Sequence, residues 1–181
     1  MKIAGKHAVA AERQEVWQLL VDPEVLRRCT PGVEELREVG DGEYDVVMQL
    51  GVGAVRGRYE GRIKVKPEEP GTTMRLDVEG RGSQGIVRGK GVLRLEGENE
   101  GTEIAYEGEV QLGGPIASVG QRMLQSTARM LAGQFFTALA AEAAARQRAR
   151  VTGQPLRPPK HGILRNFIRF LWSLLKRWFG R

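Results

Sequence analysis

The chain contains few residues that could carry out catalysis. Its 181 residues include one cysteine, Cys29, and two histidines, His7 and His161. A single cysteine excludes a disulfide framework and a cysteine metal cluster, and we expect no metal site. Cys29 lies near a predicted helix end without an evident histidine partner, which favours a buried structural thiol over a nucleophile.

The other candidates for acid–base chemistry are tyrosines. Tyr44, Tyr59 and Tyr106 occupy positions that we predict to face inward, together with few carboxylates. An enzyme would need an acid and a base that converge in a cavity. Residues 51–53, Gly-Val-Gly, precede a predicted strand rather than a helix, so they do not form a phosphate-binding loop. We therefore expect a protein that is not an enzyme.

Charge is distributed unevenly along the chain. The net charge is +6, yet residues 146–181 contain ten basic residues and no acidic one. The preceding 145 residues carry 18 basic and 22 acidic side chains, so an acidic body precedes a basic tail. The first residues lack an apolar stretch of signal-peptide length, and we expect the body to lie in the cytoplasm.

The end of the tail, residues 163–181, predicts an amphipathic helix. On a helical wheel its apolar side chains fall within an arc of about 200°, and polar side chains fill the remainder. A helix of about 26 Å is short for a bilayer core of about 30 Å, and Arg169 would lie near mid-depth. Aromatic residues, a cationic face and no acidic residue indicate a helix that lies in the membrane interface.

The predicted partner of this helix is the anionic cytoplasmic surface of the cell membrane, to which the protein would bind peripherally. Docking into a groove of a partner protein is the second alternative, and nucleic-acid binding would not explain the apolar face. Residues 151–162, with three prolines and two glycines, predict a linker. The predicted membrane-binding residues are Ile163, Leu164, Arg165, Phe167, Ile168, Arg169, Phe170, Leu171, Trp172, Leu174, Leu175, Lys176, Arg177, Trp178 and Phe179.

Residues 1–150 predict one α+β domain that begins with small elements. Alternation predicts a strand over residues 2–9, and apolar spacing predicts a helix over residues 11–21. Asp22 followed by Pro23 is typical of a helix start, and the Pro31 region ends that short helix.

The larger elements of this domain follow from two periodicities. Strict alternation of apolar and charged residues over five segments between residues 44 and 112 predicts an antiparallel meander with one solvated face. Helical spacing then predicts one long helix from Pro115 to about Arg150, whose Ala- and Arg-rich end would extend past the sheet. The expected architecture is a curved antiparallel sheet wrapped around this helix.

Glycine makes up 24 of the 181 residues, about twice its usual share. Glycine inside a strand usually marks a bend or a close approach of another backbone. On the concave face, the missing side chains also predict a cavity between the sheet and the long helix. The glycines predicted to face inward are Gly57, Gly61, Gly80, Gly89, Gly91 and Gly108.

The predicted cavity suits an apolar ligand, because aliphatic, aromatic and methionine side chains would surround it. Each of these residues taken alone is also consistent with ordinary core packing. The predicted ligand-binding residues are Trp17, Leu20, Leu26, Met48, Leu50, Tyr59, Leu76, Val78, Met123, Met130 and Phe135.

Several motifs in residues 1–140 resemble the CoxG family of carbon monoxide dehydrogenase proteins. They are Asp22-Pro23-Glu24-Val25-Leu26, Cys29-Thr30-Pro31-Gly32, residues 51–61 (GVGAVRGRYEG), Gly113-Gly114 and Gln134-Phe135-Phe136. The resemblance implies the helix-grip fold of START and Bet v 1 proteins (the SRPBCC superfamily), whose cavity binds lipids and other apolar molecules. It also implies recruitment of a molybdenum-containing dehydrogenase to the membrane and handling of a quinone as electron acceptor.

The sequence thus predicts a non-catalytic carrier that is tethered to the membrane, binds an apolar molecule such as a quinone or lipid, and carries no covalent cofactor. Two alternatives remain open at this point. One is a small cyclase- or hydratase-like enzyme of the same fold. The other is an assembly factor for a dehydrogenase that binds no ligand.

Overall fold

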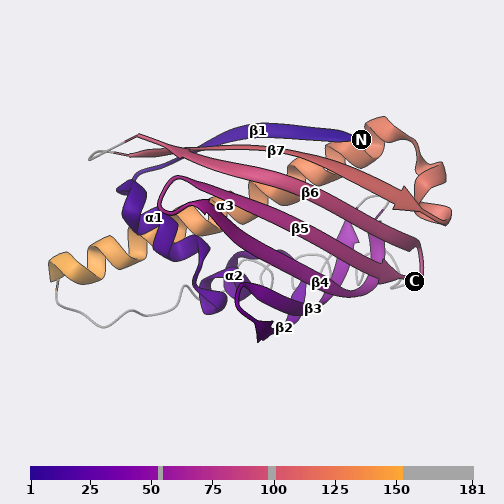
Figure 1. The fold of residues 1–181 in the computed structure, drawn as a ribbon, viewed down its shortest axis with the longest axis horizontal. Helices are drawn as coiled ribbons and strands as arrows, with labels where there is room; N and C mark the ends of the chain where they lie inside the picture. Colours follow the sequence, from indigo (N-terminus) through magenta and orange to yellow (C-terminus); the bar gives the residue numbers. More distant parts are fainter. Residues whose placement is uncertain (53–54, 98–100, 153–181) are drawn as a thin grey trace, which may run out of the picture.

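The computed structural model describes residues 1–52, 55–97 and 101–152 (Figure 1). The predicted tail helix and all but the first two residues of the predicted linker lie outside these described residues. The elements follow in the order β1 (Lys2–Val9), α1 (Arg13–Leu20), α2 (Pro23–Cys29), β2 (Val33–Gly40), β3 (Glu43–Val52), β4 (Val55–Glu69), β5 (Thr73–Gly82), β6 (Gly85–Glu96), β7 (Thr102–Gly113), the 3-10 helix η1 (Pro115–Val119) and α3 (Gln121–Thr152).

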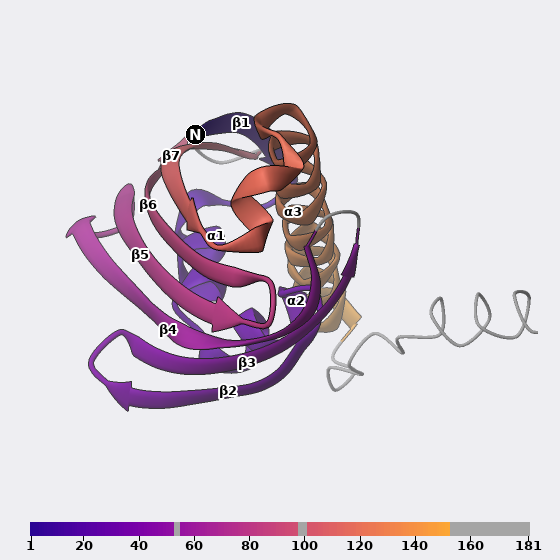
Figure 2. The same ribbon diagram turned by 90° about the vertical axis from the view of Figure 1, so that its right-hand side faces the viewer.

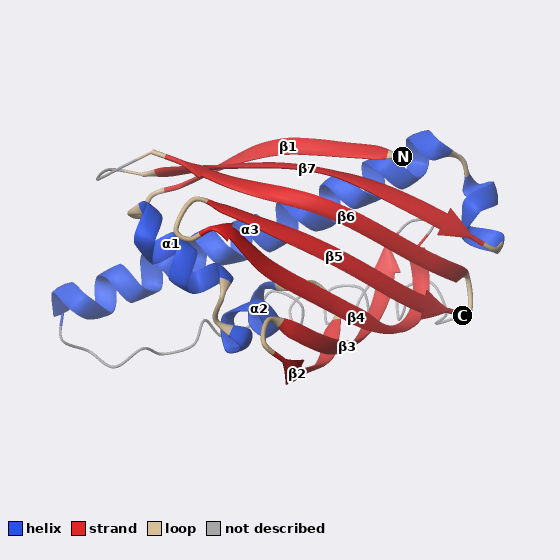
Figure 3. Cartoon of the chain, viewed as in Figure 1, coloured by secondary structure: helices blue, strands red, loops and turns tan. Residues whose placement is uncertain are grey.

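The seven strands form one antiparallel sheet in the order β1-β7-β6-β5-β4-β3-β2. Six strands follow one another as a meander, and β1 joins the far edge beside β7. The sheet curves around α3, which lies along its concave side (Figures 2 and 3). This arrangement confirms the predicted α+β helix-grip fold.

The alternation of residue types places charge on the convex face of the sheet. Side chains of adjacent strands form ion pairs there: Asp45 of β3 pairs with Arg62 of β4 at 2.9 Å, and Arg94 of β6 pairs with Glu107 of β7 at 2.7 Å. These pairs are solvent-exposed, so each adds little stability. They keep the convex face hydrated and leave the opposite face to pack against α3.

Strand β2 was not among the five predicted segments. Its pairing with β3 is interrupted by register shifts between Val33 and Glu35 and between Glu38 and Gly40. A bulge inserts a residue and breaks the period of two. The alternation that identified the other strands is therefore absent from β2.

The long helix differs from the prediction at both ends. It does not run from Pro115, because η1 ends at Gly120, whose φ of 97° is incompatible with a continuous helix. Its Ala- and Arg-rich end also does not extend past the body. Ala143 is buried there, and Glu142 forms an ion pair of 2.6 Å with Arg28 of α2.

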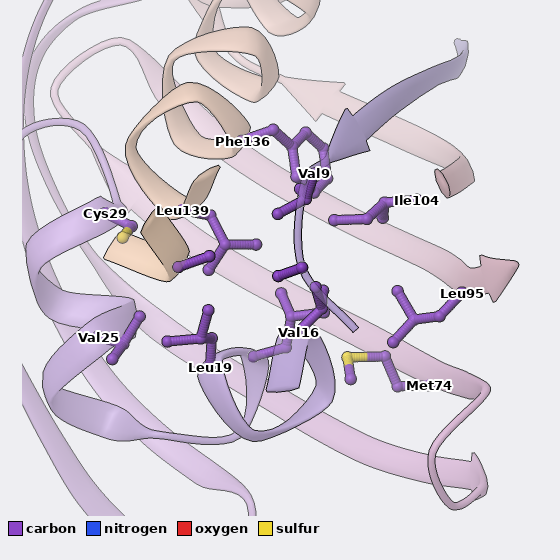
Figure 4. Close-up of a cluster of buried hydrophobic side chains, with 13 residues drawn as sticks. Val9, Val16, Leu19, Val25, Cys29, Met74, Leu95, Ile104, Phe136 and Leu139 are labelled. Carbon is purple, nitrogen blue, oxygen red and sulfur yellow. The ribbon is translucent and has the colours of Figure 1, made fainter. Parts of the chain in front are cut away.

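The densest core lies at the end of the molecule where α1 and α2 meet the second half of α3. Figure 4 shows side chains of these three helices facing residues at the ends of β1, β6 and β7, with Leu139 of α3 near Val16 and Leu19 of α1. The core residues drawn and labelled are Val9, Val16, Leu19, Val25, Cys29, Met74, Leu95, Ile104, Phe136 and Leu139. The first half of α3 lies over the rest of the sheet, where packing is less complete.

Candidate functional site

Two adjoining apolar chambers lie between the sheet and α3. The α2 chamber has a volume of about 320 Å³ and is lined by Leu20, Leu26, Thr30, Pro31, Val33, Leu36, Tyr44, Met48, Leu50, Ile63, Val65, Met74, Leu76, Leu93, Tyr106, Leu131, Ala132, Phe135 and Phe136. The η1 chamber has a volume of about 250 Å³ and is lined by Met1, Ile3, Val46, Met48, Leu50, Val55, Tyr59, Glu60, Gly61, Ile63, Val78, Glu79, Gly80, Val87, Val110, Leu112, Ile116, Leu124, Thr127, Ala128 and Leu131. Met48, Leu50, Ile63 and Leu131 line both chambers.

The structure brings eight of the eleven predicted ligand-binding residues together in these walls. Leu20, Leu26, Leu76 and Phe135 line the α2 chamber, Tyr59 and Val78 line the η1 chamber, and Met48 and Leu50 line both. Their binding of a ligand stays a prediction. Ile63 and Leu131 were missed as site residues, although both lay on the apolar stripes from which the prediction was drawn.

The inward placement predicted for Met123 and Met130 is wrong. Their exposed fractions are 53% and 39%, and neither lines a chamber. The helical stripe was drawn too far to one side of α3. Leu124 and Leu131, the next residue in each case, point into the chambers.

The exposed methionines nevertheless mark one flank of α3. Gln125 donates a hydrogen bond to the Lys2 carbonyl oxygen, and Phe136 stacks on His7, so this side of α3 faces β1. At 100° per residue, Met123 and Met130 fall on the opposite flank, beyond Leu131. Apolar side chains are therefore exposed along the side of α3 that points away from β1.

Trp17 also lines neither chamber. Its side chain is half-buried against the core cluster beneath α1. Helix α1 contributes only Leu20 to the chamber walls, because its other buried residues, Val16 and Leu19, fill the dense core.

Two glycines on neighbouring strands explain how the sheet bends and stays hollow. Gly61 of β4 and Gly80 of β5 face each other in register. A Cβ atom on Gly61 would collide with the Glu79 carbonyl oxygen and lie 2.7 Å from the Gly80 Cα atom, so the close backbone approach requires glycine there. A Cβ atom on Gly80 would come no nearer than 4.0 Å to any other atom, so the missing side chain at Gly80 leaves open space in the η1 chamber.

The polar groups of the chamber walls are mostly satisfied. The Thr30 hydroxyl donates to the Leu26 carbonyl oxygen at 2.7 Å, and the Thr127 hydroxyl donates to the Met123 carbonyl oxygen at 3.0 Å. Glu60 and Glu79 pair with arginines on the convex face. Burial raises the pKa of the Tyr59 phenol. It also raises the pKa of Tyr44, with a smaller contribution from Glu38. Both tyrosines are therefore neutral at physiological pH.

Ion pairs hold α1 and α2 to the last turns of α3. Arg146 donates to Asp22 at 2.7 Å, and Arg150 lies 3.7 Å from Glu15, in addition to the Arg28–Glu142 pair. Asp22 also caps α2, because its side chain accepts hydrogen bonds from the backbone of the first turn, as predicted. Burial alone would raise the pKa of Asp22, but the hydrogen bond from Arg146 and those from the backbone outweigh it and lower the pKa.

Cys29 is buried beside this cluster. Burial raises the pKa of its thiol to about 11, and the nearby Glu142 carboxylate adds to the shift. A thiol with so high a pKa is a poor nucleophile at neutral pH. In the described part of the chain, no group of three His, Cys, Asp or Glu side chains is arranged to hold a metal ion. No helix of residues 1–52, 55–97 or 101–152 is long and apolar enough to cross a bilayer.

Residues 5–144 match the CoxG family, described as a component of carbon monoxide dehydrogenase. The chain belongs to this family. No curated protein sequence is similar enough to the chain to match.

Solved structures support the membership of this CoxG chain in the helix-grip class. A conserved protein from Geobacillus kaustophilus is 34% identical, with a TM-score of 0.77 over 80% of this chain and 95% of that one. The Zhui aromatase/cyclase from Streptomyces sp. R1128 is 19% identical, with a TM-score of 0.63 over 83% of this chain and 97% of that one. A START superfamily protein from Mycobacterium smegmatis is 10% identical, with a TM-score of 0.63 over 79% and 97%. The last two show the shared fold alone.

Proposed function

We propose that this CoxG family member is a non-catalytic carrier of an apolar ligand, in particular a quinone, that is tethered to the cytoplasmic side of the cell membrane. There it would serve or recruit a molybdenum-containing dehydrogenase of the carbon monoxide dehydrogenase type. The observation that carries the proposal is the pair of adjoining apolar chambers in a protein of this family.

The chambers support a role in binding cargo. Ligand sites in proteins commonly occupy about 300–1,000 Å³ and are lined by apolar side chains with a few polar groups. The two chambers, of about 320 and 250 Å³, share one wall, so a ring in one and a chain in the other is a natural fit for a prenylated quinone. Methionine at the shared wall adapts to varied shapes.

The exposed flank of α3 supports loading from a bilayer. Residues 110–141 contain no acidic residue, whereas Arg122 and Arg129 precede the exposed Met123 and Met130 directly. An apolar edge with nearby cations suits the surface of an anionic leaflet. The predicted amphipathic tail would hold the chambers at that surface and raise their effective concentration there.

The tether is tested by deleting residues 163–181. The wild-type protein is expected to co-sediment with vesicles that contain phosphatidylglycerol, whereas the deletion variant is expected to remain in the supernatant. Retention of the deletion variant on the vesicles would contradict the tether. Native mass spectrometry of the full chain extracted from its own membranes then tests the cargo, with a bound quinone as the expected adduct.

A small cyclase or hydratase is the second candidate, because one structural neighbour is an aromatase/cyclase. The chamber walls favour the carrier. Among the described lining residues, the titratable groups are three tyrosines and the two glutamates that pair with arginines outside the chambers. A carrier is expected to release its ligand unchanged, so a chemically altered ligand recovered after incubation would favour the enzyme.

A further inference from the structure

The hydroxyls of two tyrosines in the chamber walls have no protein partner. Tyr44 lines the α2 chamber, Tyr59 lines the η1 chamber, and each residue is 5% exposed. Among the described residues, no group forms a hydrogen bond to either hydroxyl, and the Tyr59 hydroxyl is wholly buried. Buried polar groups are nearly always hydrogen-bonded, because an unpaired one has lost its water without compensation.

The backbone fixes the position of the Tyr59 ring. Tyr59 of β4 lies in register with Gly82 of β5. A Cβ atom on Gly82 would lie 2.7 and 2.9 Å from two ring carbons, so the ring packs directly on the strand where a side chain is missing. The hydroxyl is therefore held in the wall of the η1 chamber instead of turning towards solvent.

The charge of the walls limits what these hydroxyls could bind. Among the described residues that line the chambers, none is lysine, arginine or histidine. The walls thus hold no cation that could balance a carboxylate or phosphate, and burying an unpaired charge is strongly unfavourable. A neutral ligand oxygen that accepts a hydrogen bond is the complement of a neutral phenol.

We propose that Tyr59 and Tyr44 donate hydrogen bonds to carbonyl oxygens of a neutral apolar ligand and thereby select carbonyl-bearing ligands, such as quinones, over hydrocarbons and fatty acids. This inference rests on the proposed carrier function. Burial raises the pKa of both phenols, which keeps them protonated as donors.

Binding of three probes to the full chain by isothermal titration tests the inference. The probes are decylubiquinone, hexylbenzene and dodecanoate. Tyr59→Phe is expected to weaken binding of decylubiquinone about three- to tenfold, which corresponds to one hydrogen bond, and to leave hexylbenzene within about twofold. Tyr44→Phe is expected to act in the same direction, and dodecanoate is expected to bind at least about tenfold more weakly than the quinone.

Tyr106→Phe is the matched control. Tyr106 lines the α2 chamber, but it stacks on Phe136 and its hydroxyl lies directly over Gly5 of β1. Its removal is expected to leave the affinity for all three probes unchanged. Unfolding provides a second measurement, because the Tyr59 hydroxyl is unpaired without ligand. Free Tyr59→Phe is expected to melt at or above the wild-type Tm.

Unchanged quinone binding in both Tyr59→Phe and Tyr44→Phe would overturn the inference. Equal loss of quinone and hexylbenzene, or a lower Tm of free Tyr59→Phe, would also overturn it, since either result indicates a packing role. If the wild-type protein binds hexylbenzene but shows no preference for the quinone, the selectivity fails while the apolar carrier survives. If it binds none of the probes, the proposed function fails and the inference with it.

Discussion

At the scale of single residues, the glycines of the concave face have two different roles. The sequence predicted both a bend and a cavity from the same six positions, without assigning either to a given glycine. Gly61 is required by the close approach of β5, whereas the space beside Gly80 is open. Residue type cannot separate the two, because the distinction depends on the coiling of neighbouring strands.

This difference gives a matched pair of variants. Gly61→Ala is expected to lower the free energy of unfolding by about 1–3 kcal/mol, because the added methyl group forces the strands apart. Gly80→Ala is expected to stay within about 0.5 kcal/mol of the wild type. Urea denaturation measures both. Equal stabilities of the two variants would contradict the assignment of close approach to Gly61.

At the same scale, Asp22 links stability to pH. Its pKa is lower in the folded protein, so the charged form adds stability above the unfolded pKa of about 4. That contribution is lost as the pH falls through the folded-state pKa. Asp22→Asn is therefore expected to be less stable than the wild type at pH 7, with a difference that shrinks below about pH 4. Urea midpoints across this range provide the measurement, and a constant difference would contradict it.

At the scale of elements, the strands were more predictable than the helices. Each strand position has only two possible faces, so alternation assigned the inward residues of β3 to β7 without knowledge of the fold. A helix presents a continuous range of angles, and the stripe predicted for α3 was displaced enough to include Met123 and Met130. Exposed methionines at the edge of a site have the same composition as buried ones, so only the packing of α3 against β1 distinguishes them.

The chambers themselves could not be predicted as shapes. The sequence identified eight residues that line them, yet apolar residues with the same spacing also fill the dense core near Leu139. Whether such residues meet or leave space depends on how α3 is held. Its ion pairs with α1 and α2 concentrate close packing at one end of the helix.

The exposed flank of α3 gives a prediction for membrane contact. A fluorescent NBD label at Met130→Cys, in a Cys29→Ala background, is expected to shift to the blue and brighten when phosphatidylglycerol vesicles are added. The same label at Glu107→Cys on the convex face is expected to stay unchanged. If both labels respond equally, or if neither responds, the flank is not the face presented to the bilayer.

At the scale of the whole molecule, the uneven charge separates two jobs along the chain. The acidic body contains the described fold, and the basic excess falls in residues 146–181. Within this segment, Arg146 and Arg150 are already engaged by the body. The basic residues of the predicted tail helix are thus the ones we expect to act on the membrane.

Reversal of these charges tests that division. Changing Arg165, Arg169, Lys176 and Arg177 together to Glu is expected to weaken binding to anionic vesicles by at least about tenfold, since each cation near the surface contributes about 1 kcal/mol. It is also expected to abolish the salt sensitivity of the remaining binding. Vesicle co-sedimentation at two salt concentrations measures both. Wild-type affinity in the variant would favour docking of the tail to a partner protein.

The position of β2 at the end of the strand order also affects how copies of the protein coexist. The outer side of an edge strand offers unpaired backbone groups to any neighbouring chain. In β2 these groups lie among exposed Glu34, Glu35 and Glu38, and the strand is interrupted by its register shifts. Approach of a second β2 would bring like charges together on a distorted template. Many copies could therefore crowd on one patch of membrane without polymerising through their sheets.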